Sequence, residues 1–175
     1  MSDYHRVKVK GGTYFFTVNL QDRSQTWLID YVDVLRESVA NVKRQRPFKI
    51  HAWVVLPDHM HAIWTLPKGD DNYSVRWREI KKQFTKNIPV NEFRTHVNIN
   101  RGERAIWQKR FWEHYIIDEM DFNRHFDYVH INPVKHGHVK AVKDWPYSSF
   151  HRSVERRIYD LNWAGLEVED VNGFE

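Results

Sequence analysis

The sequence predicts an α+β fold, a ferredoxin-like sandwich in which a central antiparallel β-sheet of four to five strands carries helices mainly on one face. Two observations indicate this class. Runs rich in β-branched and aromatic residues alternate with amphipathic stretches in the order strand-helix-strand-strand-helix-strand. The 175 residues, 41% of them hydrophobic and 29% charged, suffice for one domain with a buried core.

Four segments have the composition of strands. They are residues 13–20, 48–56, 59–66 and 110–117. Only Pro57 and Asp58 separate the second segment from the third. So short a connection joins antiparallel neighbours, and these two segments are therefore expected to form a hairpin.

Three helices are expected between and after these strands. They cover residues 28–42, residues 74–87 and a stretch from near residue 120 to the Asn132–Pro133 boundary. Residues 89–105 show no clear period and are expected to form a loop. Residues 1–150 are expected to form the functional domain, and residues 151–175 a polar tail that is partly mobile.

The composition favours a cytoplasmic protein with a polyanionic partner. The net charge is +4, and many of the eight tryptophans lie close to arginine or lysine in the sequence. Interleaved rings and cations suit a surface that holds phosphates while bases stack, although burial is the commoner role for any one tryptophan. No segment reaches the roughly 20 apolar residues of a membrane span, and no apolar signal sequence is present. The lack of cysteine excludes disulfides and thiolate metal sites.

A pair of histidines interrupts an apolar run in the stretch PDHMHAIW. His59 and His61 are two positions apart on an expected strand, so both side chains project from the same face. Neutral imidazoles are good ligands for divalent first-row metals, and the pair therefore predicts a metal site. The alternative is two surface histidines on a solvated sheet face, which leaves their place in an apolar run unexplained.

The late helix places further polar groups on one stripe. His125, Tyr128 and Asn132 are three and four residues apart. Asn132 offers a carbonyl oxygen as a third metal ligand, and Tyr128 offers a phenol that can attack a DNA phosphate as a nucleophile. Such an attack joins the protein to the 5′ side and releases a 3′-OH. The alternative is a core tyrosine and an asparagine that caps the helix before Pro133.

Four motifs together resemble the REP-associated tyrosine transposases, single-tyrosine transposases of the His-hydrophobe-His endonuclease superfamily. The motifs are DHMH, WQKRFWEHYI, YVHINPVKHG and DWPYSSF. The resemblance implies single-stranded DNA folded into repetitive extragenic palindromic (REP) hairpins as the substrate. It also implies His59 and His61 as metal ligands, Asn132 as the third ligand and Tyr128 as the nucleophile. The ion would be Mg²⁺ or Mn²⁺, and two nitrogen ligands suit manganese slightly better. No organic cofactor is expected.

DNA contacts are predicted from the basic side of the second helix and from the aromatic block that follows the loop. The predicted residues are Arg78, Lys81, Lys82, Lys86, Trp107, Arg110 and Trp112. Solvated charge is the alternative for each lysine, and burial is the alternative for at least one tryptophan. Tyr115 is a second candidate nucleophile, but it has no amide partner at helical spacing.

Two other functions remain open at this stage. One is a regulator that binds REP hairpins without chemistry, against which the complete set of site residues argues. The other is a metal-dependent hydrolase that uses activated water. A monomer is expected, with a dimer as the alternative, and DNA as substrate would associate the protein with the nucleoid.

Overall fold

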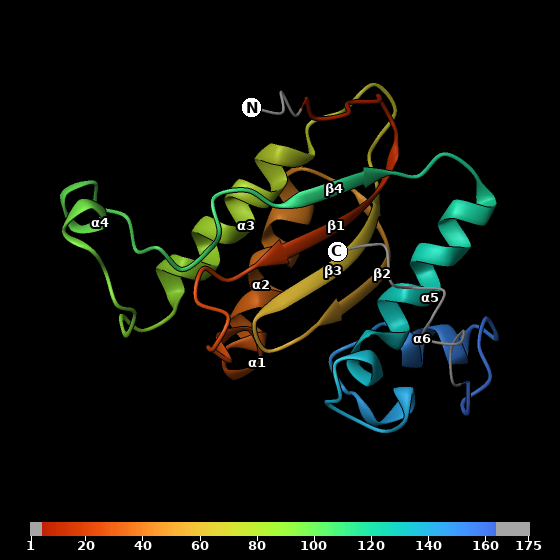
Figure 1. Ribbon diagram of the computed structural model, residues 1–175. Coiled ribbons are helices and arrows are strands. Elements are labelled where there is room, and N and C mark those ends of the chain that lie inside the picture. The colour runs from red at the N-terminus through yellow and green to blue at the C-terminus, as the bar shows by residue number, and fades with distance from the viewer. Residues whose placement is uncertain (1–4, 164–175) are drawn as a thin grey trace.

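The computed structural model describes residues 5–163 (Figure 1). Its strands are β1 (Thr13–Asn19), β2 (Lys49–Val55), β3 (His59–Thr65) and β4 (Trp112–Tyr115). Its helices are α1 (Trp27–Asp30), α2 (Val32–Gln45), α3 (Tyr73–Asn87), α4 (His96–Asn100), α5 (Glu119–Lys135), the 3₁₀ turn η1 (Val142–Asp144) and α6 (Phe150–Glu155).

The four strands form one antiparallel sheet in the order β2-β3-β1-β4. Helices α1 and α2 connect β1 to β2 at one edge, and α3 connects β3 to β4 at the other. The two central strands, β3 and β1, each have a strand of the sheet on both sides. This arrangement confirms the predicted ferredoxin-like α+β class.

A later segment extends the sheet beyond β2. The backbone N–H of Val55 donates to the carbonyl of Tyr147 at 2.8 Å, and the N–H of Ser149 donates to the carbonyl of Trp53 at 2.8 Å. An exposed strand edge carries unpaired backbone groups, and this segment satisfies part of that edge. The DWPYSSF motif thus has a structural role at the sheet edge.

Side-chain alternation gives the sheet two different cores. Phe16 on β1 and Trp64 on β3 belong to a core shared with α2 and α3. Phe15 and Ile63 each precede one of these residues and point to the other face, where they belong to a second core shared with α5. Figure 1 shows α5 on the opposite side of the sheet from α2 and α3. The helix that carries Tyr128 therefore covers a face of its own.

Helix α5 continues past the boundary that the sequence predicts. Pro133 lacks a backbone N–H, and the sequence therefore predicts a helix end there, but helical structure extends to Lys135. The end is set by Gly137, which has a φ of 73° and donates to the carbonyl of Val134 at 2.9 Å. His138 donates to the carbonyl of Pro133 at 2.9 Å, which completes a Schellman motif.

Two other segments differ from expectation in detail. The first predicted helix is divided at Tyr31 into α1 and α2. The predicted loop contains the short helix α4, whose first turn is capped by the side chain of Thr95. Figure 1 shows α4 far from the sheet at the tip of the connection between α3 and β4.

The first residues of the predicted tail are folded. Helix α6 begins at Phe150, which is fully buried against Ile131 and Val142. The division at residue 150 stays a prediction, and residues 164–175 lie outside the described residues. Between residues 5 and 163, no helix is both long and apolar enough to cross a bilayer.

Candidate active site

Strand β3 places His59 and His61 on the face of the sheet that α5 covers. Met60 and Ala62 alternate with them and enter the opposite core. Solvent reaches 4% of His59 and 1% of His61, and their ring centroids lie 5.1 Å apart. This burial does not fit the alternative of two solvated surface histidines.

Both imidazoles are held through Nδ1. Nδ1 of His59 lies 2.7 Å from Oδ1 of Asp58, and because a carboxylate only accepts, this nitrogen carries the hydrogen. Arg23 forms an ion pair with the same carboxylate. Nδ1 of His61 lies 2.9 Å from Oγ1 of Thr17, its cross-strand neighbour on β1. Metal-binding histidines are commonly oriented in this way, with Nε2 left for the ion.

Burial and nearby charges keep Asp58 ionised and His61 neutral. Burial raises the pKa of Asp58, but the hydrogen bonds from His59 and Arg23 outweigh it and hold the pKa below the usual aspartate value. Burial lowers the pKa of His61 well below its usual value, and the nearby His59 and His136 lower it further. At neutral pH Asp58 is an anion and His61 a neutral imidazole, as coordination requires.

Tyr128 faces the histidine pair from α5. Its ring centroid lies 5.2 Å from that of His61 at an interplanar angle of 68°, and 5.8 Å from that of Phe15. The Tyr128 side chain is fully buried. Lys135 donates from Nζ to the phenol oxygen at 3.3 Å. A positive charge at this distance stabilises an anionic oxygen.

Asn132 lies one turn after Tyr128 and is also fully buried. Among residues 5–163, neither Oδ1 nor Nδ2 of its amide has a hydrogen-bond partner, and neither has Nε2 of His61. A buried polar group without a partner costs roughly 1–3 kcal/mol. Nitrogen and amide oxygen donors suit a divalent first-row ion, so the residues present fit the expected metal.

The second candidate nucleophile lies elsewhere. Tyr115 on β4 packs against Tyr14, with ring centroids 5.6 Å apart, on the side of the sheet that α2 and α3 cover. The histidine pair lies on the opposite side. The structure therefore brings Tyr128, and not Tyr115, to the candidate metal ligands.

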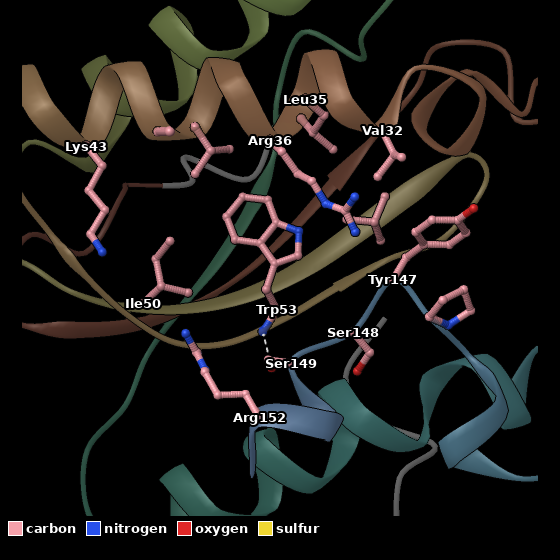
Figure 2. A pocket seen from close by; sticks show the side chains of 14 residues that line it. Val32, Leu35, Arg36, Lys43, Ile50, Trp53, Tyr147, Ser148, Ser149 and Arg152 are labelled. Atoms are coloured by element: carbon pink, nitrogen blue, oxygen red, sulfur yellow. Dashed lines mark hydrogen bonds between the residues drawn. The ribbon is translucent and has the colours of Figure 1, made fainter. Parts of the chain in front are cut away.

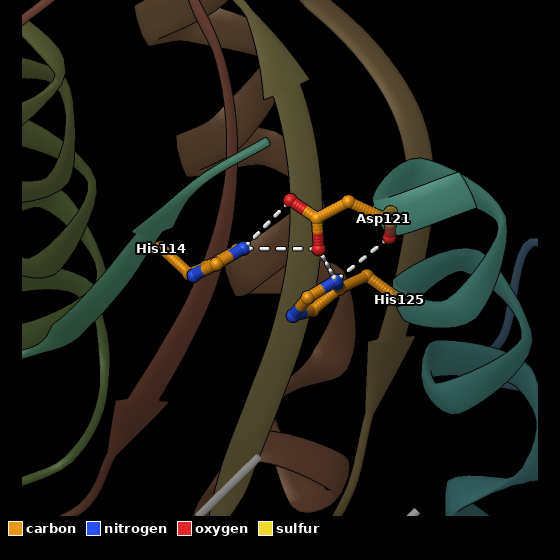
Figure 3. A group of neighbouring side chains, drawn as sticks. All are labelled: His114, Asp121 and His125. Carbon is orange, nitrogen blue, oxygen red and sulfur yellow. Dashed lines mark hydrogen bonds and ion pairs between the residues drawn. The ribbon is translucent and has the colours of Figure 1, made fainter. Parts of the chain in front are cut away.

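A second group of side chains on the α5 face can hold a metal ion. His114, Asp121 and His125 each offer a ligand atom, and these atoms all lie within 4.8 Å of one another. Figure 3 shows His114 on β4 pointing toward Asp121 and His125 on α5. Sequence reasoning placed His125 beside Tyr128 and His114 near the site, but it missed Asp121. The signal was the four-residue spacing of Asp121 and His125 on one helix face.

The predicted basic surface on α3 lies away from Tyr128. Arg78, Lys82 and Lys86 are exposed, whereas Lys81 is largely buried and donates to the carbonyl of Gln108 at 3.0 Å. Burial lowers the pKa of Lys81 to about 8, with a further contribution from Arg6. Because α3 packs on the opposite side of the sheet from α5, contacts there would be remote from the histidine pair.

The aromatic block is divided between the core and the surface. Trp107 packs against Phe84 and donates from Nε1 to Oγ1 of Thr85 at 3.0 Å. Arg110 is exposed. Trp112 is 39% exposed and lies on the same sheet face as Phe15, with ring centroids 5.8 Å apart. Among the predicted DNA contacts, Trp112 is therefore placed on the face that carries Tyr128.

A cavity of about 450 Å³ lies between α2 and the segment that pairs with β2. Figure 2 shows Trp53 at its centre, with Arg36, Lys43 and Arg152 around it. Trp53 packs with the core of α2 and α3, so this cavity opens on the side away from His61. It is not part of the candidate active site.

The sequence resembles known proteins over its full length. A protein of Escherichia coli (strain K12) named REP-associated tyrosine transposase is 53% identical over 175 residues, covering 100% of this chain and 98% of that protein. This chain belongs to the REP-associated tyrosine transposase family. The family expectation and the expectation of a transposase are thereby confirmed.

Other comparisons agree with membership of the REP-associated tyrosine transposases. A Haemophilus influenzae relative named for the same family is 49% identical over 176 residues, covering 99% of each protein. A solved structure of a REP-associated tyrosine transposase bound to a REP hairpin superposes with a TM-score of 0.84 and 52% identity, covering 100% of this chain and 96% of that one. No family model matches the chain.

Proposed function

We propose that this transposase cuts and rejoins single-stranded DNA at REP hairpins through a covalent 5′-phosphotyrosine intermediate on Tyr128. The observation that carries the proposal is the position of the Tyr128 ring, 5.2 Å from the ring of His61, with the buried amide of Asn132 one helical turn further along α5. A structural tyrosine would not need such neighbours. The solved family member bound to a REP hairpin supports the choice of substrate.

The metal ligands in this proposal are Nε2 of His59, Nε2 of His61 and Oδ1 of Asn132. A Mg²⁺ or Mn²⁺ ion bound there supplies Lewis-acid polarisation of phosphate oxygens. Asp58 and Thr17 keep the two imidazoles oriented through Nδ1. These ligands come from regular elements, β3 and α5, so the packing of the helix on the sheet sets their separation in the absence of DNA.

Tyr128 performs the transfer. Its oxygen forms a bond to phosphorus as the bond from phosphorus to the 3′ oxygen breaks. The phenol proton passes to solvent, and the departing 3′ oxygen takes up a proton to become a 3′-OH. Lys135 stabilises the phenolate oxygen from 3.3 Å. The reverse attack, by a 3′-OH on the phosphotyrosine, rejoins DNA and restores the phenol.

Access to the nucleophile requires a movement. The Tyr128 side chain is fully buried against Phe15 and His61, so a DNA phosphate reaches its oxygen only after the side chain or α5 shifts. Trp112, exposed on the same sheet face, is placed to stack on an unpaired base. The cations of α3 would contact the DNA backbone farther away.

One chain contains the whole proposed site. His59 and His61 come from β3, and Tyr128 and Asn132 come from α5 of the same chain. A partner subunit is therefore not needed to supply a nucleophile or a metal ligand. We propose that the enzyme acts as a monomer in the cytoplasm, at the nucleoid where its substrate lies.

The deciding experiment is adduct formation on a REP hairpin. A single-stranded hairpin oligonucleotide labelled at its 3′ end is incubated with protein and Mn²⁺ and run on a denaturing gel. Wild type should retain the label on the protein, Tyr128→Phe should not, and Tyr115→Phe should match wild type because Tyr115 lies on the other face.

The two alternatives give different results in the same assay. A hydrolase with activated water would still cut the oligonucleotide in the Tyr128→Phe variant. A regulator would bind the hairpin without any adduct in wild type. Either result would contradict the proposed chemistry.

A further inference from the structure

We propose that His114, Asp121 and His125 form a second divalent metal site, of the class that binds zinc, which fastens α5 to β4 beside the proposed nucleophile. The proposal concerns residues other than His59 and His61 and does not depend on the DNA chemistry. It starts from three ligand atoms within 4.8 Å of one another (Figure 3).

The distances are close to those of a coordination sphere. Nε2 of His114 lies 2.8 Å from Oδ2 of Asp121. Nδ1 of His125 lies 3.0 Å from Oδ1 of the same carboxylate and donates to the backbone carbonyl of Asp121 at 2.8 Å. Ligand bonds of about 2.0–2.2 Å in a tetrahedron place neighbouring donors roughly 3.3 Å apart. An ion bound between these atoms would take the place of the hydrogens on Nε2 of His114 and Nδ1 of His125, because a coordinating nitrogen carries no hydrogen.

The donor set selects the kind of ion. Two imidazoles and one carboxylate suit zinc and neighbouring transition metals, whereas Mg²⁺ and Ca²⁺ favour oxygen. Solvent reaches 34% of the His114 side chain, 15% of Asp121 and 1% of His125. Because His114 is partly exposed, water can reach the site as a further ligand. His125 lies on the side that is closed to solvent.

Neighbouring groups orient these ligands. The backbone N–H of Ile117 donates to Oδ2 of Asp121 at 2.9 Å. Trp112 stacks on His114 at an interplanar angle of 15°, and the rings of His114 and His125 stack at 17° with centroids 4.5 Å apart. The three side chains are therefore already oriented toward one another before any ion binds, which lowers the entropic cost of coordination.

The alternative is a latch made only of hydrogen bonds. In that case Nε2 of His114 donates to the carboxylate of Asp121, and the hydrogen on Nδ1 of His125 is shared between that carboxylate and the backbone carbonyl of Asp121. Hydrogen bonds alone compensate a shielded carboxylate less well than a divalent cation does. An ion between the same atoms supplies that charge and connects strand to helix more firmly.

The site would stabilise the placement of Tyr128. His125 precedes Tyr128 by one turn, and Phe15 contacts both, with ring centroids 4.8 Å and 5.8 Å away. Phe15 also stacks on His61, with ring centroids 5.4 Å apart. The Phe15 ring therefore packs against one candidate ligand of each proposed metal site. An ion that fixes His125 to β4 would limit how far α5 moves when DNA binds.

Metal binding to the full chain, without DNA, tests the proposal. Protein stripped with a chelator is titrated with Co²⁺, whose visible absorption reports coordination geometry, and the number of ions is measured by calorimetry. Wild type should bind two ions, Asp121→Asn should bind one, and His61→Ala should bind one and keep the absorption of the second site. His138→Gln, an exposed histidine outside both groups, should behave as wild type.

Thermal unfolding gives an independent readout. Zn²⁺ should raise the melting temperature of wild type and of His61→Ala, and it should raise that of Asp121→Asn by less than wild type, because only the site at His61 remains in that variant. His114→Gln provides the same comparison if Asp121→Asn does not fold, because His114 is the most exposed of the three ligands. Unchanged ion number and absorption in both variants would overturn the proposal and leave the hydrogen-bonded latch. The nicking assay can fail without affecting these measurements.

Discussion

Lys135 places its ammonium nitrogen 3.3 Å from the hydroxyl oxygen of Tyr128, seven residues earlier on the same face of α5. Its nitrogen also lies 4.9 Å from the centroid of the tyrosine ring. The motif YVHINPVKHG therefore joins the candidate nucleophile to a cation, and the helix has to continue past Pro133 for the two to meet.

The first prediction concerns this cation. Replacing Lys135 with methionine should slow formation of the covalent adduct by about 10- to 100-fold, because the phenolate oxygen loses its stabilising charge. Single-turnover kinetics on the labelled hairpin measures the effect. Lys135→Arg should recover most of the rate, and Lys143→Met, which removes an exposed lysine paired with Asn162, should have no effect. A Lys135→Met variant as fast as wild type would remove Lys135 from the mechanism.

The second prediction concerns the carboxylate behind His59. Asp58→Asn keeps the shape of the side chain but removes the charge that holds Nδ1 of His59 and pairs with Arg23. The affinity for Mn²⁺ should fall by about 10- to 100-fold, as is typical for such supporting carboxylates. Calorimetric titration measures it. Asp33→Asn, whose side chain is 91% exposed on α2, is the matched control and should bind Mn²⁺ like wild type.

The third prediction separates stability from function at Asn132. Its buried amide has no hydrogen-bond partner in the part of the chain that the structure describes, so Asn132→Leu should increase the free energy of unfolding of metal-free protein by about 1–3 kcal/mol. The same variant should fail to form the adduct. Urea unfolding with chelator present measures the first effect, and Asn123→Leu, an exposed change on the same helix, should not produce it. A large loss of stability in Asn132→Leu would indicate that the amide has partners in the folded protein.

Local sequence patterns were enough to predict most of the fold. The strand that carries His59 and His61 and the helix that carries Tyr128 both follow from periodicity, because alternation and helical spacing are local properties. The end of α5 was misplaced because a proline is usually read as a stop, whereas the glycine two residues beyond the helix sets its end.

Contacts between distant segments were harder to predict. Thr17 meets His61 because β1 and β3 pair in one particular register, and no spacing in the sequence reveals that register. Lys81 belongs to a basic stripe on a helical projection, but the packing of Gln108 against it turns its ammonium inward. The layer order that separates α3 from α5 likewise depends on tertiary packing.

The fourth prediction concerns stability at acidic pH. His130 is fully buried, its Nδ1 lies 2.8 Å from the carbonyl oxygen of Phe126, and its Nε2 lies 2.8 Å from Oγ of Ser149. Burial is the main reason that the pKa of His130 falls from 6.5 to about 4. The hydrogen bond to Phe126 raises this pKa, and the charge of Arg152 lowers it further. The folded protein therefore binds this proton less readily than the unfolded chain does.

The stability supplied by neutral His130 is complete above about pH 6.5 and is lost as the pH falls toward 4, because only the unfolded chain takes up the proton in that interval. The loss should reach about 3 kcal/mol. His130→Gln should be less stable at pH 7 but should show a shallower decline between pH 6.5 and 4, measured by urea unfolding. His138→Gln, which removes an exposed imidazole, should keep the wild-type slope. Equal slopes in wild type and His130→Gln would mean that His130 is protonated as easily in the folded protein as in the unfolded chain.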